Sequence, residues 1–204
     1  GWLPQPLEME ITSTYDYVAQ LKRKDTPGDR FEYTSVNTFI LAYIIERLTG
    51  MPLAEILTQE IWRHIGAESD GLLAVSPSGA PAAHGGLCCC LRDLARFGLL
   101  FTSTGETPNP QWQIPISLLK HIQVEGRPSI FLKGPNGPQI IQDLHGEAPR
   151  HNSWQWDYVM QDGDFFKGGY GGQGLYCSPG RDAVIAYFGT PFDEKMETHE
   201  LQWI

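Results

Sequence analysis

Apolar residues recur at helical spacing in the first 122 residues of the chain. The strongest pattern covers residues 36–48, where large apolar side chains stand three or four positions apart and Gly50 follows the last of them. This pattern predicts a helix that is buried on most of its sides. A second helix is expected to begin at Pro52 and to stop at Gly66, so that the two form a helical hairpin.

Weaker helical patterns predict three shorter helices, over residues 14–24, 90–101 and 114–122. Ser117 is expected to cap the last of them. Residues 123–153 contain many Gly and Pro and show no period, so they are predicted to be a long surface loop.

Short aromatic and β-branched runs replace the helical pattern from residue 154 onward. Four such runs are separated by the turn sequences QDGD, GG and SPGRD, which predicts an antiparallel meander. The tail from residue 192 returns to helical spacing. A mainly helical part (14–122), a loop, and then strands with a terminal helix (154–204) predict an α+β fold in a single domain spanning 1–204.

Composition and charge narrow the classes of function. The 204 residues are 41% hydrophobic and 19% charged, which is typical of a globular protein. The net charge of −9 argues against a general nucleic-acid or anionic-membrane binder. No apolar run reaches the length of a membrane span, and the N-terminal residues lack the order of a signal peptide, so the compartment, bacterial periplasm or cytoplasm, stays open.

The four cysteines show no paired CxxC spacing. Three of them are consecutive, at 88–90, and the fourth is Cys177. We expect buried, reduced thiols and no metal site.

The stretch FFKGGYGGQG, residues 165–174, has glycines on both sides of Tyr170. Glycine weakens a strand, so this density indicates that something approaches the backbone closely. A tight bend is the alternative explanation.

Tyr33 stands at the entrance of the predicted helix at 36–48, with Thr34, Ser35 and Asn37 behind it. A tyrosine in this position can serve as a positioned acid or base. The same residues can also form a capping cluster with an aromatic lid, and this segment alone does not separate the two interpretations.

Taken together, these motifs resemble the serine hydrolases of the β-lactamase and penicillin-binding-protein family, in the branch of class C β-lactamases, esterases and 6-aminohexanoate-dimer hydrolases. The resemblance runs from about Tyr15 to Ile204. It rests on PGDRFEYTSVNTFILAYIIERLTGMPLAEIL, HGGLCCCLRDLARFGLLF, SWQWDYV and FFKGGYGGQGLYCSPGRDAVIAYFG, which occur in the family's order. The implied fold is β-lactamase-like, with the N-terminal strands and the nucleophile helix missing.

The resemblance implies a role for each candidate residue. Tyr33 would be the catalytic tyrosine, and the strand around Gly169, Tyr170 and Gly171 would form one wall of the site, with Tyr170 or Gly171 donating a backbone N–H to an oxyanion. Ser35 stands where Tyr-x-Asn relatives have Asn, and Asn37 lies four places after Tyr33. These two residues and Trp154 are candidate substrate contacts.

The Ser-x-x-Lys pair that acylates in this family is not found before Tyr33. Its spacing recurs only at Ser117–Lys120, after the tyrosine, where the family has a peripheral helix. We therefore expect the C-terminal part of a longer hydrolase, inactive alone, which associates with itself or with a separate N-terminal piece.

The leading hypothesis is a serine hydrolase of small amides or esters that works through an acyl-enzyme and needs no cofactor. The alternatives are a non-catalytic binding protein with the same pocket, and a structural or interaction domain.

Overall fold

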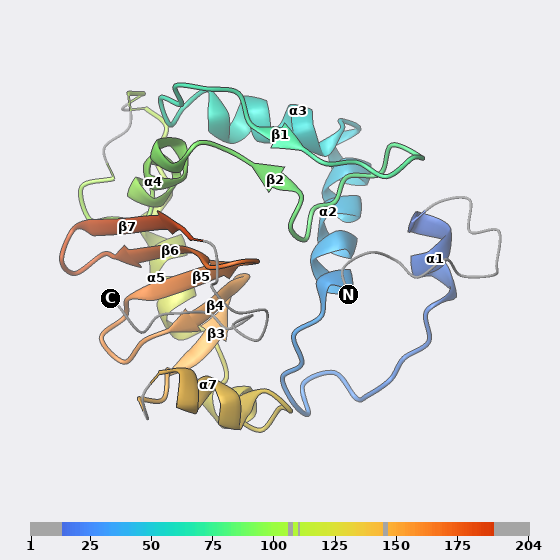
Figure 1. Ribbon diagram of the computed structural model, residues 1–204, viewed down its shortest axis with the longest axis vertical. Coiled ribbons are helices and arrows are strands. Elements are labelled where there is room, and N and C mark those ends of the chain that lie inside the picture. Colours follow the sequence, from blue (N-terminus) through green and yellow to red (C-terminus); the bar gives the residue numbers. More distant parts are fainter. Residues whose placement is uncertain (1–13, 106–107, 110, 145–146, 190–204) are drawn as a thin grey trace.

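The computed structural model describes residues 14–105, 108, 109, 111–144 and 147–189. Its first part is helical, with a small two-stranded sheet, and its last part is a five-stranded sheet (Figure 1). The helical elements are α1 (Thr14–Gln20), α2 (Ser35–Thr49), α3 (Leu53–Leu57), the π-helix η1 (Thr58–Trp62), α4 (Leu91–Leu99) and α5 (Ile116–Val124). The small sheet pairs β1 (Leu72–Leu73) with β2 (Leu87–Cys88). The predicted C-terminal helix lies outside the described residues.

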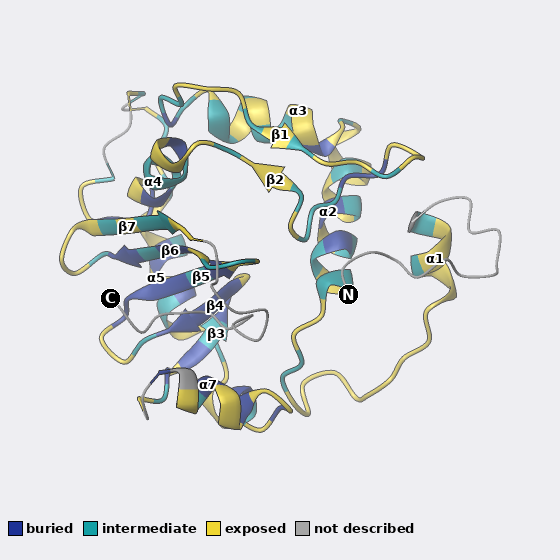
Figure 2. Cartoon of the chain, in the orientation of Figure 1, coloured by how far each residue is buried: buried dark blue, intermediate teal, exposed yellow. Residues whose placement is uncertain are grey.

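Helix α2 confirms the predicted position but not the predicted burial. Gly50 follows it at φ 71°, a left-handed conformation that glycine adopts without strain. Only Phe39 and Ala42 are buried within the helix. Leu41, Ile44 and Ile45 are each a little less than half exposed and Leu48 is mostly exposed. Exposed and partly buried residues occur along the helix (Figure 2). The prediction of burial on most sides was wrong because α3 and the aromatic ring of Tyr15 cover only part of the helix surface.

The second predicted helix is interrupted. Pro52 is the N-cap of α3 and not its first helical residue, and α3 passes directly into η1. Gly66, at φ 69°, follows in the turn that ends this region. The apolar period carries no information on the change from α to π hydrogen bonding, so the sequence pattern could not predict it.

The segment 123–153 is not the loop that its Gly and Pro content predicted. It contains α6 (Pro128–Phe131), α7 (Gly137–Asp143) and β3 (His151–Ser153). Each helix has a proline at its first or second position, where the missing N–H costs nothing. These helices are short, at four and seven residues, which leaves too few turns for a visible period.

The large sheet is an antiparallel meander, as predicted, with five strands because β3 precedes the four expected ones. The order is β3-β4-β5-β6-β7, with β4 (Trp156–Val159), β5 (Phe165–Gly169), β6 (Gln173–Ser178) and β7 (Ala183–Phe188). Helix α4 packs on β6 and β7, and α5 packs on β3 and β4. Gly98 lets α4 approach closely, because a Cβ there would lie 2.6 Å from Val184 Cγ1.

Each face of this sheet carries its own hydrophobic core. Neighbouring residues on a strand point to opposite faces, so Phe165 and Phe166 belong to different cores. The first core includes residues of α4 and α5, and the second includes Phe131 of α6 and Ile140 of α7. Among the described residues, no helix has both the length and the apolar character needed to cross a membrane.

Candidate active site

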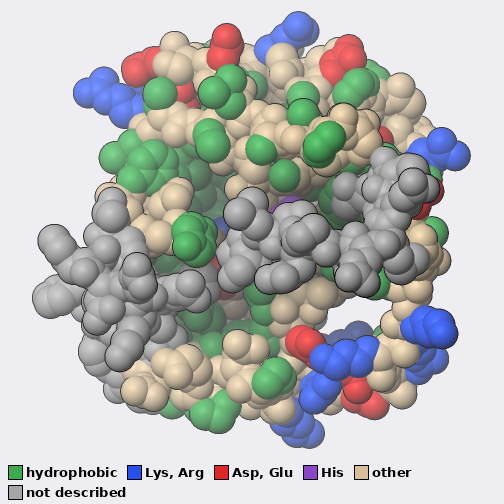
Figure 3. All heavy atoms as spheres, turned by 45° about the vertical axis from the view of Figure 1, so that its right-hand side comes forward, with side chains coloured by type: hydrophobic (Ala, Val, Ile, Leu, Met, Phe, Trp, Pro, Cys, Tyr) green, Lys and Arg blue, Asp and Glu red, His purple; other side chains and the backbone are tan. Residues whose placement is uncertain are grey.

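The site is centred on an apolar cavity of about 450 Å³ between the sheet and helices α4 and α5. Figure 3 shows hydrophobic side chains gathered along a hollow on this side of the molecule. The lining residues from the sheet are Trp154, Gln155, Trp156, Lys167, Gly168, Gly169, Gln173, Gly174 and Leu175. Cavities that combine apolar walls with a few polar groups are the usual form of small-molecule sites.

Lys167, which lines this cavity, lies beside the predicted catalytic residue Tyr33, which is not itself a lining residue. The Nζ atom of Lys167 lies 5.7 Å from the centre of the Tyr33 ring. Tyr33 stands in the segment before α2, and half of its surface is exposed. A cation this close to an aromatic face is attracted to it, so the pair ties the helical part to the sheet.

Asp157 fixes the position of the Lys167 ammonium group. The Oδ2 atom of Asp157 lies 3.0 Å from Lys167 Nζ and accepts the backbone N–H of Gly168 at 2.8 Å. Lys167 Nζ also donates to the Gly168 carbonyl at 2.7 Å. The Asp157 carboxylate is almost fully buried, so this charged pair is held in one arrangement.

Asp157 and Lys167 are functional-site residues that were not predicted from the sequence. Both stand inside motifs that carry the resemblance, SWQWDYV and FFKGGYGGQG. An acidic residue at a buried position of one strand and a lysine on its neighbour are a signal of a paired charge. That signal becomes usable only when the register of β4 and β5 is known.

The structure places the predicted wall residues at the end of β5 and in the loop after it. The β5–β6 ladder ends at Gly169 and Gln173, so Tyr170, Gly171 and Gly172 form the hairpin loop. Gly171 and Gly172 have φ of 76° and 79°, so this turn itself requires them. Gly169 lines the cavity. Close approach of a ligand to the backbone can therefore explain only some of the glycines in residues 165–174, and the turn explains the others.

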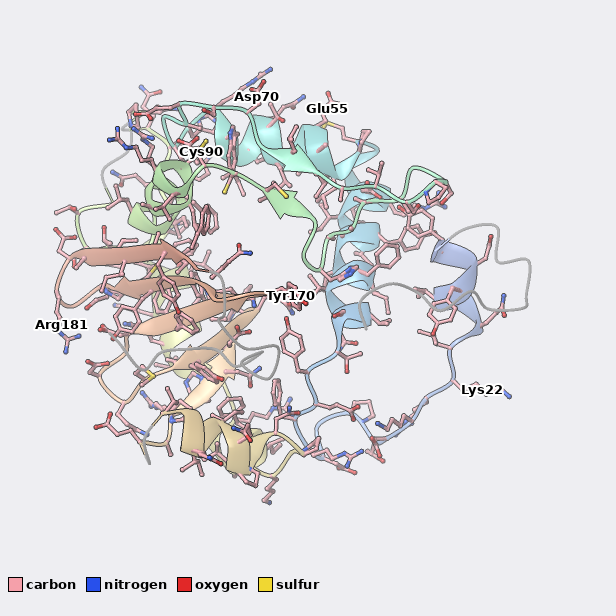
Figure 4. All side chains as sticks on the ribbon, viewed as in Figure 1. Lys22, Glu55, Asp70, Cys90, Tyr170 and Arg181 are labelled. Carbon is pink, nitrogen blue, oxygen red and sulfur yellow. The ribbon has the colours of Figure 1, made fainter. Side chains whose placement is uncertain are left out.

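Tyr170 projects from the tip of this hairpin toward α2 (Figure 4). Two thirds of its surface is exposed, and its carbonyl accepts a hydrogen bond from Gln173 Nε2 at 2.8 Å. The predicted oxyanion role of the Tyr170 or Gly171 N–H stays a prediction.

Trp154 lies at the cavity as a wall residue, in an unusual turn. Trp154 and Gln155 connect β3 to β4 with φ of 49° and 67°. Two non-glycine residues in this conformation store strain, and such strain is concentrated at functional sites. Gln155 Oε1 accepts a hydrogen bond from Thr38 Oγ1 of α2 at 2.6 Å, which is a second link between α2 and the sheet.

The remaining candidates lie apart from the cavity lining. Ser35 is the first residue of α2 and is partly buried, and Asn37 is exposed one half turn later. Ser117 and Lys120 are exposed on α5, outside the cavity lining. Ser117 is the second residue of α5 and does not cap it, because Pro115 occupies the N-cap position.

The cysteines differ from the predicted buried set. Cys88 and Cys90 are exposed, Cys89 is partly buried, and only Cys177 is fully buried. Within the described residues no three His, Cys, Asp or Glu side chains are grouped as a metal site would require.

The family model described as Beta-lactamase matches residues 2–201. The chain belongs to the beta-lactamase family. The match covers nearly the whole chain, and it confirms the resemblance inferred from the four motifs.

The chain is similar to two proteins named 6-aminohexanoate-dimer hydrolase. It is 28% identical over 206 residues to the 6-aminohexanoate-dimer hydrolase of Paenarthrobacter ureafaciens, covering 99% of this chain and 50% of that protein. A solved structure from Bacillus anthracis, assigned as a 6-aminohexanoate-dimer hydrolase, is 31% identical with a TM-score of 0.71 and covers 89% of this chain and 44% of its own.

The fold extends to a more distant hydrolase. EstCE1, a hydrolase with promiscuous acyltransferase activity, superimposes with a TM-score of 0.55 at 15% identity, over 82% of this chain and 53% of its own. This likeness supports the β-lactamase-like fold. The chain spans about half the length of the relatives it matches.

Proposed function

We propose that these residues form the substrate-holding and proton-transferring part of a hydrolase of amide or ester bonds. The observation that carries the proposal is the position of Tyr33 beside the ammonium group of Lys167, a residue that lines the apolar cavity. A hydroxyl that can give and take a proton, next to a fixed cation, suits a reaction in which negative charge develops on oxygen.

In the proposed reaction, a serine hydroxyl oxygen bonds to the substrate carbonyl carbon and the bond to the leaving nitrogen or oxygen breaks. Tyr33 passes the hydroxyl proton to the leaving group. Water then attacks the acyl-enzyme and restores the serine. The serine would come from outside residues 1–204, since Ser117 lies on the exposed side of α5 and outside the cavity.

The relatives favour an amide as the bond that is cut, because two of them carry the name 6-aminohexanoate-dimer hydrolase. This chain would then act on small linear amides, with an ester as the more reactive test substrate. No metal or organic cofactor takes part in the proposed chemistry.

Binding without turnover is the second candidate. It is favoured by the hydrogen bonds of Lys167 to Asp157 and to the Gly168 carbonyl, which give the lysine a structural role as well. In that case the cavity would hold a small amide without cutting it.

The deciding experiment compares Tyr33→Phe with the wild type, in the longest polypeptide that the gene encodes. Hydrolysis of a nitrophenyl ester and of linear 6-aminohexanoate dimer should fall by about 100-fold or more, while the melting temperature stays unchanged. Tyr17→Phe is the matched control, because Tyr17 is an exposed tyrosine of α1. Equal rates for Tyr33→Phe and the wild type would reject the proposed role, and a wild type that binds the dimer without turnover would support the second candidate.

A further inference from the structure

A second cavity, of about 320 Å³, lies at the free edge of β3. Trp154 lines both this cavity and the apolar one, so the two are neighbours. The second cavity is more polar than the apolar one, since two arginines and several polar side chains line it. Its lining residues are Arg30, Phe31, Glu125, Gly126, Arg127, Ile130, Phe131, Asn152, Ser153 and Trp154. We call it the edge pocket.

Arg127 gives the edge pocket a guanidinium group that no acidic side chain of the described residues engages, although the Glu125 carboxylate also lines the pocket. Arg30 is paired with Asp25 at 2.8 Å. Glu125 accepts the indole N–H of Trp154 at 2.9 Å. Within the described part of the chain, the guanidinium group of Arg127 makes no ion pair and no hydrogen bond. It lies against Gly28, where a Cβ would come within 2.6 Å of Nη1, so the glycine leaves room for it.

Ser153 adds a buried hydroxyl that also lacks a partner. The residue is 8% exposed and lines the edge pocket, and its hydroxyl forms no hydrogen bond to the described residues. A buried polar group without a partner is unfavourable, and the few that occur often mark the place of a ligand or a water molecule. The Asn152 side chain, partly buried beside it, offers a further amide.

We propose that the edge pocket binds the carboxylate end of the substrate or of the released product. The Arg127 guanidinium would bind the two carboxylate oxygens, and the Ser153 hydroxyl would donate a hydrogen bond to one of them. The apolar chain of the ligand would run along Trp154 toward the cavity that holds Lys167. The substrate class is therefore an amide or ester with a terminal carboxylate.

That the bound ligand extends toward Tyr33 and Lys167 rests on the proposed function. That the edge pocket binds a carboxylate does not. The chain as a whole carries a net charge of −9, which repels anions from most of its surface. A carboxylate that binds must therefore find a local positive site. Arg127 is the charged residue of the edge pocket that can supply it without giving up a partner.

The experiment is a titration of the full chain with hexanoate, and with hexanamide as its neutral analogue, by calorimetry. The Trp154 indole N–H resonance, identified by its loss in Trp154→Phe, reports binding at the wall that the two cavities share, and the Arg127 variant below assigns the binding to the edge pocket. We expect saturable binding of hexanoate, a shift of this resonance, and binding of hexanamide that is at least tenfold weaker. Equal affinity for the two ligands, no saturable binding of hexanoate, or no shift would overturn the proposal.

Two arginine variants separate the local charge from the net charge. Arg127→Gln should weaken hexanoate binding at least tenfold. Arg150→Gln removes the same charge from an exposed arginine outside both cavities and should change the affinity by less than twofold. Similar weakening in both variants would overturn the role of Arg127. The comparison of hexanoate with hexanamide on the wild type keeps the proposal testable if Arg127→Gln does not fold.

Ser153→Ala tests the buried hydroxyl. Because this hydroxyl has no partner among the described residues, its removal should leave the melting temperature unchanged or slightly higher, while hexanoate binding weakens about threefold. Unchanged affinity would remove Ser153 from the site. These titrations need no turnover, so their failure is distinguishable from the failure of the Tyr33→Phe experiment.

Discussion

The ammonium nitrogen of Lys167 lies 5.7 Å from the centre of the Tyr33 ring, which joins the segment before α2 to strand β5. Asp157 on β4 holds the same ammonium at 3.0 Å. The tyrosine, the lysine and the carboxylate therefore come from three separate segments. They meet at Lys167, which lines the apolar cavity, and the proposed chemistry would take place there.

Replacement of Lys167 by methionine should lower both activity and stability. The Asp157 carboxylate would keep only the Gly168 N–H as a partner, and the loss of its buried cation should cost about 1–3 kcal/mol of unfolding free energy. Ester hydrolysis should fall about 100-fold if the cation stabilises developing charge. Urea unfolding and an ester assay check the two effects.

Lys133→Met is the matched control for this experiment, because Lys133 is exposed and outside both cavities. It should leave both quantities unchanged. An active Lys167→Met variant would limit Lys167 to a structural role.

The strained turn at Trp154 and Gln155 should show a trade-off between stability and function. Asn-Gly at these positions adopts positive φ readily, so the double variant should be more stable by about 1 kcal/mol, even after loss of the exposed hydrogen bonds to Thr38 and Glu125. Hydrolysis should fall about tenfold because the indole wall between the two cavities is gone. Thermal unfolding and the ester assay measure both. A less stable double variant would show that the turn stores no strain.

Asp93 should make stability depend on acid pH. Burial by itself raises the pKa of this carboxyl, but hydrogen bonds from the Glu68 N–H and from Arg96 oppose it. A further bond from the Ser69 N–H adds to them, and the net pKa is lowered. The stabilisation is therefore complete above the unfolded-state pKa of about 4 and is lost as the pH falls below it.

Urea midpoints from pH 6 to pH 3 measure this dependence on Asp93. The wild type should lose stability over this range, and Asp93→Asn should lose less of it. Asp70→Asn is the control, since Asp70 is an exposed carboxylate in the same region. Parallel curves for the wild type and Asp93→Asn would contradict the assignment.

The four thiols should react in a graded order with Ellman's reagent. Cys88 and Cys90 are exposed and should react first. Burial and the nearby Asp93 raise the pKa of Cys89, which should slow its reaction. Cys177 is fully buried, with its pKa raised chiefly by burial, and should react only on unfolding. Mass mapping of the labelled peptides gives the order, and early labelling of Cys177 would contradict the packing of β6 against α4.

The sequence by itself determined the elements whose signals are local. The apolar period and Gly50 placed α2 to within a residue or two, and short runs between turn sequences predicted the antiparallel meander. The order of four motifs was sufficient to recognise the family. These features depend on residues close together in the chain, so a pattern of a few positions encodes them.

Only the tertiary structure decided which distant residues meet. The pairing of Lys167 with Tyr33 and Asp157 depends on strand register and on the path of the chain before α2. The exposure of one face of α2 could not be predicted from the sequence either. An apolar period shows that a face can be buried, but it does not show what covers that face. The edge pocket also depends on the tertiary structure. Nothing in the sequence distinguishes Arg127 or Ser153, and the fold brings to one cavity a guanidinium group and a hydroxyl that have no partner among the described residues.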